Sequence, residues 1–169
     1  MVINKSAIFL DRDGVINICK VVNGKPYAPR SYKKFKLFDH TLTSLKKIKN
    51  MGFLSIIITN QPDIGNKKVK INEIEKMHSK LYKTKLIDKI YVCPHSQSEN
   101  CICRKPSPYL MFKAKKDLAI NFKNSWMIGD RYSDIQAGEN AGLNTIFIDK
   151  KYKETVYDLI NCKIVYSLI

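Results

Sequence analysis

The sequence predicts a single α/β domain built on a doubly wound, mostly parallel β-sheet. Short apolar runs alternate along the chain with amphipathic segments, which is the pattern of repeated strand–helix units. The apolar runs are continuous rather than alternating, as expected for parallel strands covered on both faces. A chain of 169 residues, 44% of them hydrophobic, suffices for one core. We therefore expect residues 1–169 to form one domain, with its site at the carboxyl ends of the strands.

Six apolar runs are candidate strands because they are short, continuous and bounded by turn-forming or polar residues. In chain order they cover residues 7–10, 53–58, 89–92, 126–128, 145–148 and 164–166.

Four segments between these runs carry apolar residues at helical spacing, and they cover about 42–51, 71–81, 107–118 and 132–141. Gly52 and Gly142 follow the first and the last, as helix stops do. The third is expected to begin with Ser107 as cap and Pro108 at the first helical position. His78 falls on the apolar stripe of the second helix and is expected to pack in the core.

The longest stretch without a strand or helix pattern covers residues 17–31, with a turn at Asn23-Gly24-Lys25-Pro26. A loop of that length within a compact domain is usually functional.

The chain is strongly basic, with a formal net charge of +15. Such a surface can attract an anion, either nucleic acid or a small phosphorylated molecule. The alternative is that the excess lysines are scattered over solvent-facing positions. The sequence contains no arginine-rich or aromatic-interleaved basic stripe, which favours the second interpretation, so we do not expect nucleic acid as a partner.

The sequence also predicts a cytoplasmic protein without membrane association. No apolar run approaches the roughly 20 residues that a membrane span needs. The N-terminal apolar run is short, ends in acidic residues and lacks a small-residue cleavage site.

A metal-ligand pattern lies in one short segment, where Cys93, His95, Cys101 and Cys103 give four ligands in eleven positions. Three thiolates and an imidazole suit tetrahedral Zn²⁺, and a complete protein shell indicates a structural site. Unligated thiols that happen to cluster are the alternative. The five cysteines are an odd number in an expected reducing compartment, so disulfides are not predicted.

Two acids directly follow the first expected strand, in Asp11-Arg12-Asp13-Gly14. Their carboxylates can project into one crevice, where they repel each other unless a cation lies between them or one is protonated. Both solutions suit phosphoryl transfer, in which one Asp attacks phosphorus and the other protonates the leaving oxygen. A turn with solvated aspartates is the alternative.

Polar residues follow two further strands at the same expected edge. Thr59, Asn60 and Gln61 end the second strand and offer hydroxyl and amide groups to phosphate oxygens. Asp130 and Asp134 follow the fourth strand at a helix start. Asp130 could complete an oxygen-rich Mg²⁺ site with the first pair of acids. Asp134 could support that shell or favour the helix N-terminus.

Two cations, Arg104 and Lys105, come directly after the last zinc-ligand candidate and just before the third expected helix. Positive charge at a helix N-terminus favours an anion at this place.

Four motifs stand in a fixed order along about residues 5–150: Asp-x-Asp-Gly, Thr-Asn-Gln, Arg-Lys-Pro and Gly-Asp-x-x-x-Asp. In this order the chain resembles the haloacid dehalogenase superfamily of phosphatases. The Cys/His loop narrows the resemblance to the branch of the D,D-heptose 1,7-bisphosphate and histidinol-phosphate phosphatases.

The resemblance implies a role for each matched position. Asp11 would be the nucleophile that forms an aspartyl phosphate, and Asp13 the general acid and base. Thr59 and Lys105 would stabilise the phosphoryl group. The implied Mg²⁺ ligands are Asp11, the backbone carbonyl of Asp13, and Asp130, with Asp134 as a further candidate. The implied substrate-binding residues are Arg12, Asn60, Gln61, Arg104 and Arg131.

The resemblance also implies an activity: a Mg²⁺-dependent phosphomonoesterase with a structural Zn²⁺. The preferred substrate is a heptose 1,7-bisphosphate cleaved at C7, for nucleotide-activated heptose and lipopolysaccharide synthesis. Histidinol phosphate is the first alternative. A nucleic-acid 3′-phosphate end-processing protein is the alternative from another class. We expect a small phosphorylated partner and a monomer.

Two features bear on the substrate. About 45 residues separate Asp13 from Thr59, and about as many separate Thr59 from Lys105. A helix and a strand or loop already fill each of these two intervals, so no separate cap domain is expected. In the heptose enzymes an Ala-Arg-Gly stretch usually follows the Thr-Asn-Gln motif, whereas this chain continues with residues 62–67, Pro-Asp-Ile-Gly-Asn-Lys. Lys67 or Lys68 could replace the missing arginine, and Lys20, Lys25 or Arg30 could reach a second phosphate or be solvated.

Overall fold

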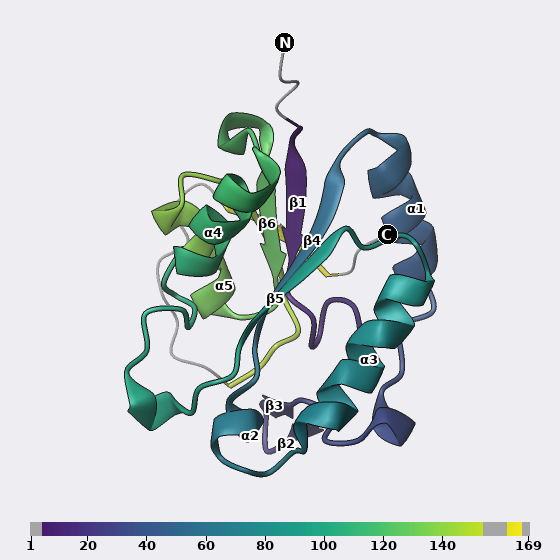
Figure 1. The fold of residues 1–169 in the computed structure, drawn as a ribbon, viewed down its shortest axis with the longest axis vertical. Coiled ribbons are helices and arrows are strands. Elements are labelled where there is room, and N and C mark those ends of the chain that lie inside the picture. Colours follow the sequence, from purple (N-terminus) through teal and green to yellow (C-terminus); the bar gives the residue numbers. More distant parts are fainter. Residues whose placement is uncertain (1–4, 154–161, 167–169) are drawn as a thin grey trace.

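The computed structural model describes residues 5–153 and 162–166. Six strands form one sheet in the order β5-β4-β1-β6-β7-β8, and every neighbouring pair is parallel. The strands are β1 (Ala7–Leu10), β4 (Leu54–Asn60), β5 (Lys89–Cys93), β6 (Trp126–Gly129), β7 (Asn144–Ile148) and β8 (Cys162–Val165). The predicted doubly wound α/β fold is confirmed, and each expected strand lies within a few residues of an observed one (Figure 1).

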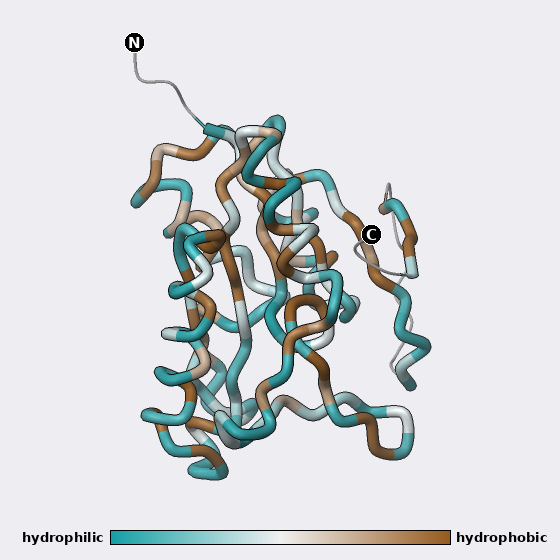
Figure 2. The backbone as a smooth tube through the Cα atoms, turned by 90° about the vertical axis from the view of Figure 1, so that its right-hand side faces the viewer, coloured by the Kyte–Doolittle hydropathy of each residue, from teal (hydrophilic) through white to brown (hydrophobic). Residues whose placement is uncertain are grey.

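Four helices flank the sheet: α1 (Thr41–Asn50), α3 (Ile71–Lys83), α4 (Tyr109–Leu118) and α5 (Tyr132–Asn140). α1 and α3 cover one face and α4 and α5 the other (Figure 1). Successive residues of a strand face opposite sides, so Phe9 packs in the core beneath α4 and α5, whereas Leu10 packs in the core beneath α1 and α3. Hydrophobic and hydrophilic residues alternate along the helical turns in Figure 2, as expected for amphipathic helices.

The segment 17–31 was expected to lack regular structure, and this expectation is wrong. It contains an antiparallel hairpin of β2 (Lys20–Val22) and β3 (Lys25–Tyr27). Asn23 and Gly24 between the strands both have positive φ, 52° and 78°. An Asn-Gly pair with two positive φ angles is the preferred two-residue hairpin turn, so the sequence did contain the signal.

The structure also adds short elements that the periodicity did not predict. They are α2 (Pro62–Gly65) and three 3₁₀ turns, Tyr32–Lys34, Gln97–Glu99 and Phe122–Asn124. α4 begins at Tyr109, so Pro108 precedes the helix instead of opening it. Among the described residues, no helix is both long and apolar enough to cross a bilayer.

The strand order changes direction at β1, because the chain continues to β4 on one side and reaches β6 on the other. In sheets of this kind the crevice lies beyond the carboxyl ends of the strands at such a reversal. Gly14, four residues after β1, has φ of 96°, and a Cβ there would overlap the Asp130 carboxylate. Glycine at this position therefore allows the loop after β1 to lie directly against the end of β6.

Candidate active site

Three buried carboxylates converge at the ends of β1 and β6. Asp11 follows β1, Asp130 follows β6, and Asp134 lies in the first turn of α5. Each offers an oxygen, and these oxygens all lie within 4.8 Å of one another. Burial raises the pKa of Asp11 to about 7 and raises that of Asp130 well above its ordinary value, with neighbouring carboxylates adding to both shifts.

This cluster fits a divalent cation. Both carboxylate oxygens of Asp130 are buried, and the opposing effects of Tyr152 and Lys105 do not prevent burial and the neighbouring carboxylates from raising its pKa. Clustered buried carboxylates are costly unless further positive charge compensates them. Hard oxygen donors gathered at one point are the donor set that Mg²⁺ takes.

Lys105 is a buried cation at the edge of the same cluster. Its Nζ lies 2.6 Å from Asp11 Oδ1 and 2.6 Å from Asp134 Oδ1, and it donates to the Ile58 carbonyl oxygen at 2.7 Å. Burial alone would lower its pKa, but the charges of Asp11 and Asp134 outweigh burial and raise it. The lysine is therefore held as an ammonium beside the Asp11 carboxylate.

Asn60 and Asp134 both hold Lys105 in place. The Lys105 backbone N–H donates to Asn60 Oδ1 at 3.1 Å, and Asn60 Nδ2 donates to the Lys105 carbonyl at 3.2 Å. Asp134 also accepts the Arg131 backbone N–H at 3.0 Å, which ties it to the start of α5. Of the two roles expected for Asp134, the helix N-terminus contact is observed, and Asp134 is also one of the three clustered carboxylates.

The Asp13 carboxylate does not belong to the three-carboxylate cluster and is fixed by side-chain donors. Gln61 Nε2 donates to Asp13 Oδ2 at 2.5 Å and to Thr59 Oγ1 at 2.8 Å. Asn17 Nδ2 donates to Asp13 Oδ1 at 3.0 Å. The motif after β4 thus orients the acid after β1, which the strand-end pattern alone did not indicate.

Three of the residues expected in the active site do not line the cavity described below: Asp130, which lies in the buried carboxylate cluster, Arg12 and Thr59. Arg12 was expected to bind substrate, but its side chain is fully buried and contacts the Asp13 carboxylate. This expectation is corrected: the chain bends at Arg12, and the side chain between the two acids points into the protein, where it reaches His78. Thr59 is also buried and lies beneath Gln61 rather than at the cavity surface.

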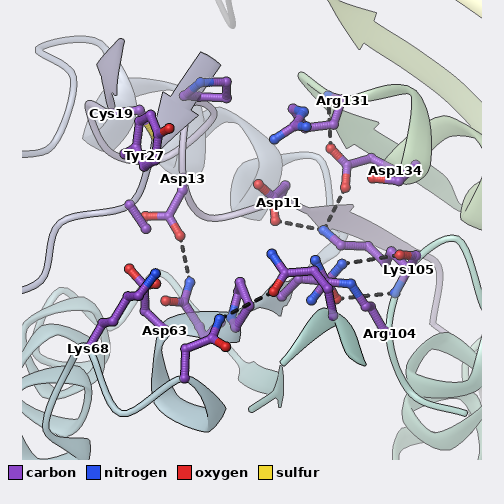
Figure 3. A pocket seen from close by; sticks show the side chains of 18 of the residues that line it. Asp11, Asp13, Cys19, Tyr27, Asp63, Lys68, Arg104, Lys105, Arg131 and Asp134 are labelled. Atoms are coloured by element: carbon purple, nitrogen blue, oxygen red, sulfur yellow. Dashed lines mark hydrogen bonds and ion pairs between the residues drawn. The ribbon is translucent and has the colours of Figure 1, made fainter. Parts of the chain in front are cut away.

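A cavity of about 700 Å³ lies above Asp11, Asp13, Lys105 and Asp134 (Figure 3). Its outer wall carries four cationic side chains and one further acid: Arg30, Lys68, Arg104, Arg131 and Asp63. Arg30 Nε lies 2.6 Å from Asp63 Oδ2, so this ion pair joins the segment after the β2–β3 hairpin to α2.

The cavity lining includes some of the basic residues considered for phosphate binding and not others. Lys68 lines the cavity and Lys67 does not, while Arg30 lines it and Lys20 and Lys25 do not. Asp63 was not expected in the wall, because nothing in a strand or helix pattern distinguishes it from a surface turn residue.

The four zinc-ligand candidates meet at one point after β5. The Sγ atom of Cys93 lies 3.5 Å from that of Cys101, and Cys103 Sγ lies 3.7 Å from Cys101 Sγ. The Nδ1 atom of His95 lies 3.7 Å from Cys93 Sγ and 3.2 Å from Cys103 Sγ. Tetrahedral Zn²⁺ with ordinary bond lengths separates its ligand atoms by about 3.5–3.8 Å. The cluster therefore fits zinc in both ligand type and spacing.

Comparison with known proteins gives consistent results. A family model described as HAD-hydrolase-like matches residues 102–155. Over 177 aligned residues the chain is 34% identical to the D-glycero-beta-D-manno-heptose-1,7-bisphosphate 7-phosphatase of Helicobacter pylori strain J99, covering 100% of this chain and 98% of that protein. It is 32% identical to the histidine biosynthesis bifunctional protein HisB of Legionella pneumophila strain Lens, covering 88% of this chain but 42% of that protein.

Among solved structures, the fold is similar to that of a D,D-heptose 1,7-bisphosphate phosphatase from B. bronchiseptica complexed with magnesium and phosphate. The TM-score is 0.82 at 20% sequence identity, covering 96% of this chain and 93% of that one. The arrangement of strands and helices is thus one that a phosphatase of known structure also has.

Proposed function

The chain belongs to the haloacid dehalogenase-like phosphatases, in the branch of the heptose bisphosphate phosphatases, and on that premise we propose that it removes the 7-phosphate of D-glycero-D-manno-heptose 1,7-bisphosphate. The observation that carries the proposal is the buried Asp11–Lys105 pair, with N···O of 2.6 Å, at the floor of a cavity whose outer wall is basic.

In the first step, an oxygen of Asp11 attacks the phosphorus atom and the bond from phosphorus to the sugar oxygen breaks. Asp13 donates a proton to that oxygen, so the sugar leaves as an alcohol instead of an alkoxide. The product on the protein is an aspartyl phosphate at Asp11. The Lys105 ammonium, held beside Asp11, stabilises the negative charge of the phosphoryl oxygens.

In the second step, Asp13 takes a proton from a water molecule, and the resulting hydroxide attacks the phosphorus atom of the ester. The bond between phosphorus and Asp11 breaks, which releases inorganic phosphate and restores both aspartates. The contacts of Asp13 with Asn17 and Gln61 keep its carboxylate at the cavity through both steps.

Asp11, Asp130 and the backbone carbonyl of Asp13 are the residues that would hold Mg²⁺, with Asp134 beside them. When bound, the cation neutralises charge on the phosphoryl group and on the clustered carboxylates.

The outer wall favours a bisphosphate over histidinol phosphate. Arg30, Lys68, Arg104 and Arg131 outnumber Asp63 there. Arg104 Nη1 is buried and has no hydrogen-bond partner among the described residues, so it can donate to an anionic group of the substrate. Histidinol phosphate has no second phosphate: it carries a cationic amine on the carbon next to its phosphate-bearing carbon and an imidazole at the end remote from the phosphate.

Phosphate release from a matched panel tests the substrate. The panel holds the alpha and beta anomers of D-glycero-D-manno-heptose 1,7-bisphosphate, histidinol phosphate and a 3′-phosphorylated DNA oligonucleotide. We expect the highest kcat/KM for a heptose bisphosphate, with only the 7-phosphate released. A preference for histidinol phosphate or for the DNA would overturn the substrate assignment while leaving the phosphatase chemistry in place.

Stabilisation by Mg²⁺ is expected to depend on pH. The pKa of Asp11 in the cation-free folded protein, about 7, lies above its ordinary 3.8, so the folded state binds this proton more tightly than the unfolded state does. The resulting stabilisation is present below pH 3.8 and is lost as the pH rises through about 7. Mg²⁺ compensates the charge that the lost proton leaves behind.

We therefore expect saturating Mg²⁺ to raise Tm by several degrees at about pH 8 and by clearly less at about pH 5. Thermal unfolding at both pH values, with and without the cation, measures the difference. An equal rise in Tm at the two pH values, or no rise at either pH, would contradict the cation site.

We further propose that the protein acts as a single-domain monomer without a cap domain, in the cytoplasm, where zinc-bound thiolates stay reduced. The structural zinc would be held by Cys93, His95, Cys101 and Cys103.

A further inference from the structure

Arg12 lies between Asp11 and Asp13 in the sequence, and its guanidinium contacts both oxygens of the Asp13 carboxylate. Nη2 lies 2.9 Å from Oδ2 and 3.0 Å from Oδ1 of Asp13, and Nε lies 3.2 Å from Oδ1. The arginine side chain is fully buried, and its guanidinium carbon lies 5.7 Å from the centre of the Phe35 ring. A planar guanidinium held in this way fixes the direction of the carboxylate as well as its position.

The remaining end of the guanidinium contacts His78 on α3, where Arg12 Nη1 lies 3.1 Å from His78 Nε2. Arginine can only donate hydrogen bonds, so Nε2 must be the acceptor and the ring proton must lie on Nδ1. Burial, followed by the charge of Arg12, lowers the pKa of His78 to about 4, against a smaller opposing effect of Asp13. The imidazole is therefore neutral near pH 7 and able to accept.

We propose that His78 is a positioning residue for the phosphatase reaction: it accepts a hydrogen bond from Arg12 and so fixes the carboxylate of Asp13 for proton transfer. His78 does not line the cavity, and the side chain it contacts in the direction of the site is Arg12. The inference rests on the proposed function, in which Asp13 is the general acid and base.

The expected effect is misplacement of Asp13 rather than its loss. Without an acceptor at position 78, Nη1 of the buried Arg12 loses a hydrogen-bond partner. Leaving a buried donor unsatisfied costs enough free energy that the guanidinium is expected to shift. Asn17 and Gln61 still hold the Asp13 carboxylate at the site, but its direction is no longer fixed from the arginine side. Small errors of position in a catalytic group cost up to about 100-fold in rate.

An aryl phosphate separates the two steps of the reaction. With p-nitrophenyl phosphate the leaving nitrophenolate needs no proton, so formation of the aspartyl phosphate does not depend on Asp13. Hydrolysis of that ester still needs Asp13 to activate water. Misplaced Asp13 should therefore leave the first step intact and slow the second.

For His78→Leu we expect a burst of about one nitrophenolate per site, followed by steady turnover reduced about 10- to 100-fold from wild type. His78→Gln, whose side-chain carbonyl can accept from Arg12, should restore turnover to within about threefold. His78→Ala is a second variant without an acceptor, in case leucine prevents folding. His40→Leu is the matched control and should behave as wild type, since His40 stacks on Phe38 instead.

Unchanged turnover in folded His78→Leu or His78→Ala would overturn the inference. So would a burst and a steady rate that fall together with the folded fraction, or a glutamine variant no better than the alanine variant. A wild-type protein that forms no aspartyl phosphate would instead contradict the proposed function, and the inference with it.

Discussion

Asp11→Asn is expected to reduce kcat by about 10⁴-fold or more, because the amide cannot attack phosphorus and no neighbouring oxygen is placed to replace it. The fold should persist. Asparagine matches aspartate in shape, and it removes one of three clustered buried carboxylates that repel one another. In the absence of a divalent cation the variant should therefore unfold at a temperature equal to or above that of wild type.

Steady-state phosphate release and thermal unfolding of the same preparation provide the two measurements. Asp117→Asn is a suitable control, because Asp117 is an exposed acid on α4 that pairs with Lys113 and lies outside the cavity. Substantial turnover by folded Asp11→Asn would exclude Asp11 as the nucleophile. Covalent labelling would then be needed to identify the residue that carries the phosphoryl group.

Cys101→Ser is expected to lower Tm by about 10 °C or more and to abolish most of the activity even when Mg²⁺ is abundant. The proposed zinc would link the loop between β5 and α4 at four points, in addition to polar contacts such as those between Asn60 and the Lys105 backbone. Cys103 immediately precedes Arg104 and Lys105, so loss of the metal releases the chain that places Lys105 between Asp11 and Asp134.

Metal analysis of carefully prepared wild-type protein should find about one zinc per chain. The Cys101→Ser variant should contain much less zinc. Cys162→Ser is the matched control, since Cys162 lies on β8 away from the cluster. Wild-type protein that is fully folded and active without zinc would refute the structural role assigned to the four ligands.

Much of the site was predictable because parallel strands end at one edge. Asp11, Thr59 and Asp130 each follow an apolar run, and residues that follow parallel strands must gather at the carboxyl edge of the sheet. The spacing of Cys93, His95, Cys101 and Cys103 was equally informative, because so few residues separate the ligands that they can only meet locally.

The direction of each side chain was not predictable in the same way. Arg12 was expected to face substrate, but the segment after β1 turns it inward toward His78, a residue 66 positions away. His78 itself fits the apolar stripe of its helix, and no periodicity distinguishes a packed histidine from one that accepts a hydrogen bond from a buried arginine.

The sequence by itself determined the fold class and the edge of the sheet that carries the chemistry, since periodicity fixes the strands and helices and parallel strands end at one edge. It also predicted two metal sites, the zinc ligands from their short spacing and the Mg²⁺ ligands from the resemblance to the family. Only the tertiary structure decided which groups touch: Lys105 between Asp11 and Asp134, Gln61 on Asp13, and Arg30 against Asp63. The physical reason is that such contacts depend on packing between segments far apart in the chain, and a one-residue change of direction moves a side chain from the cavity to the core.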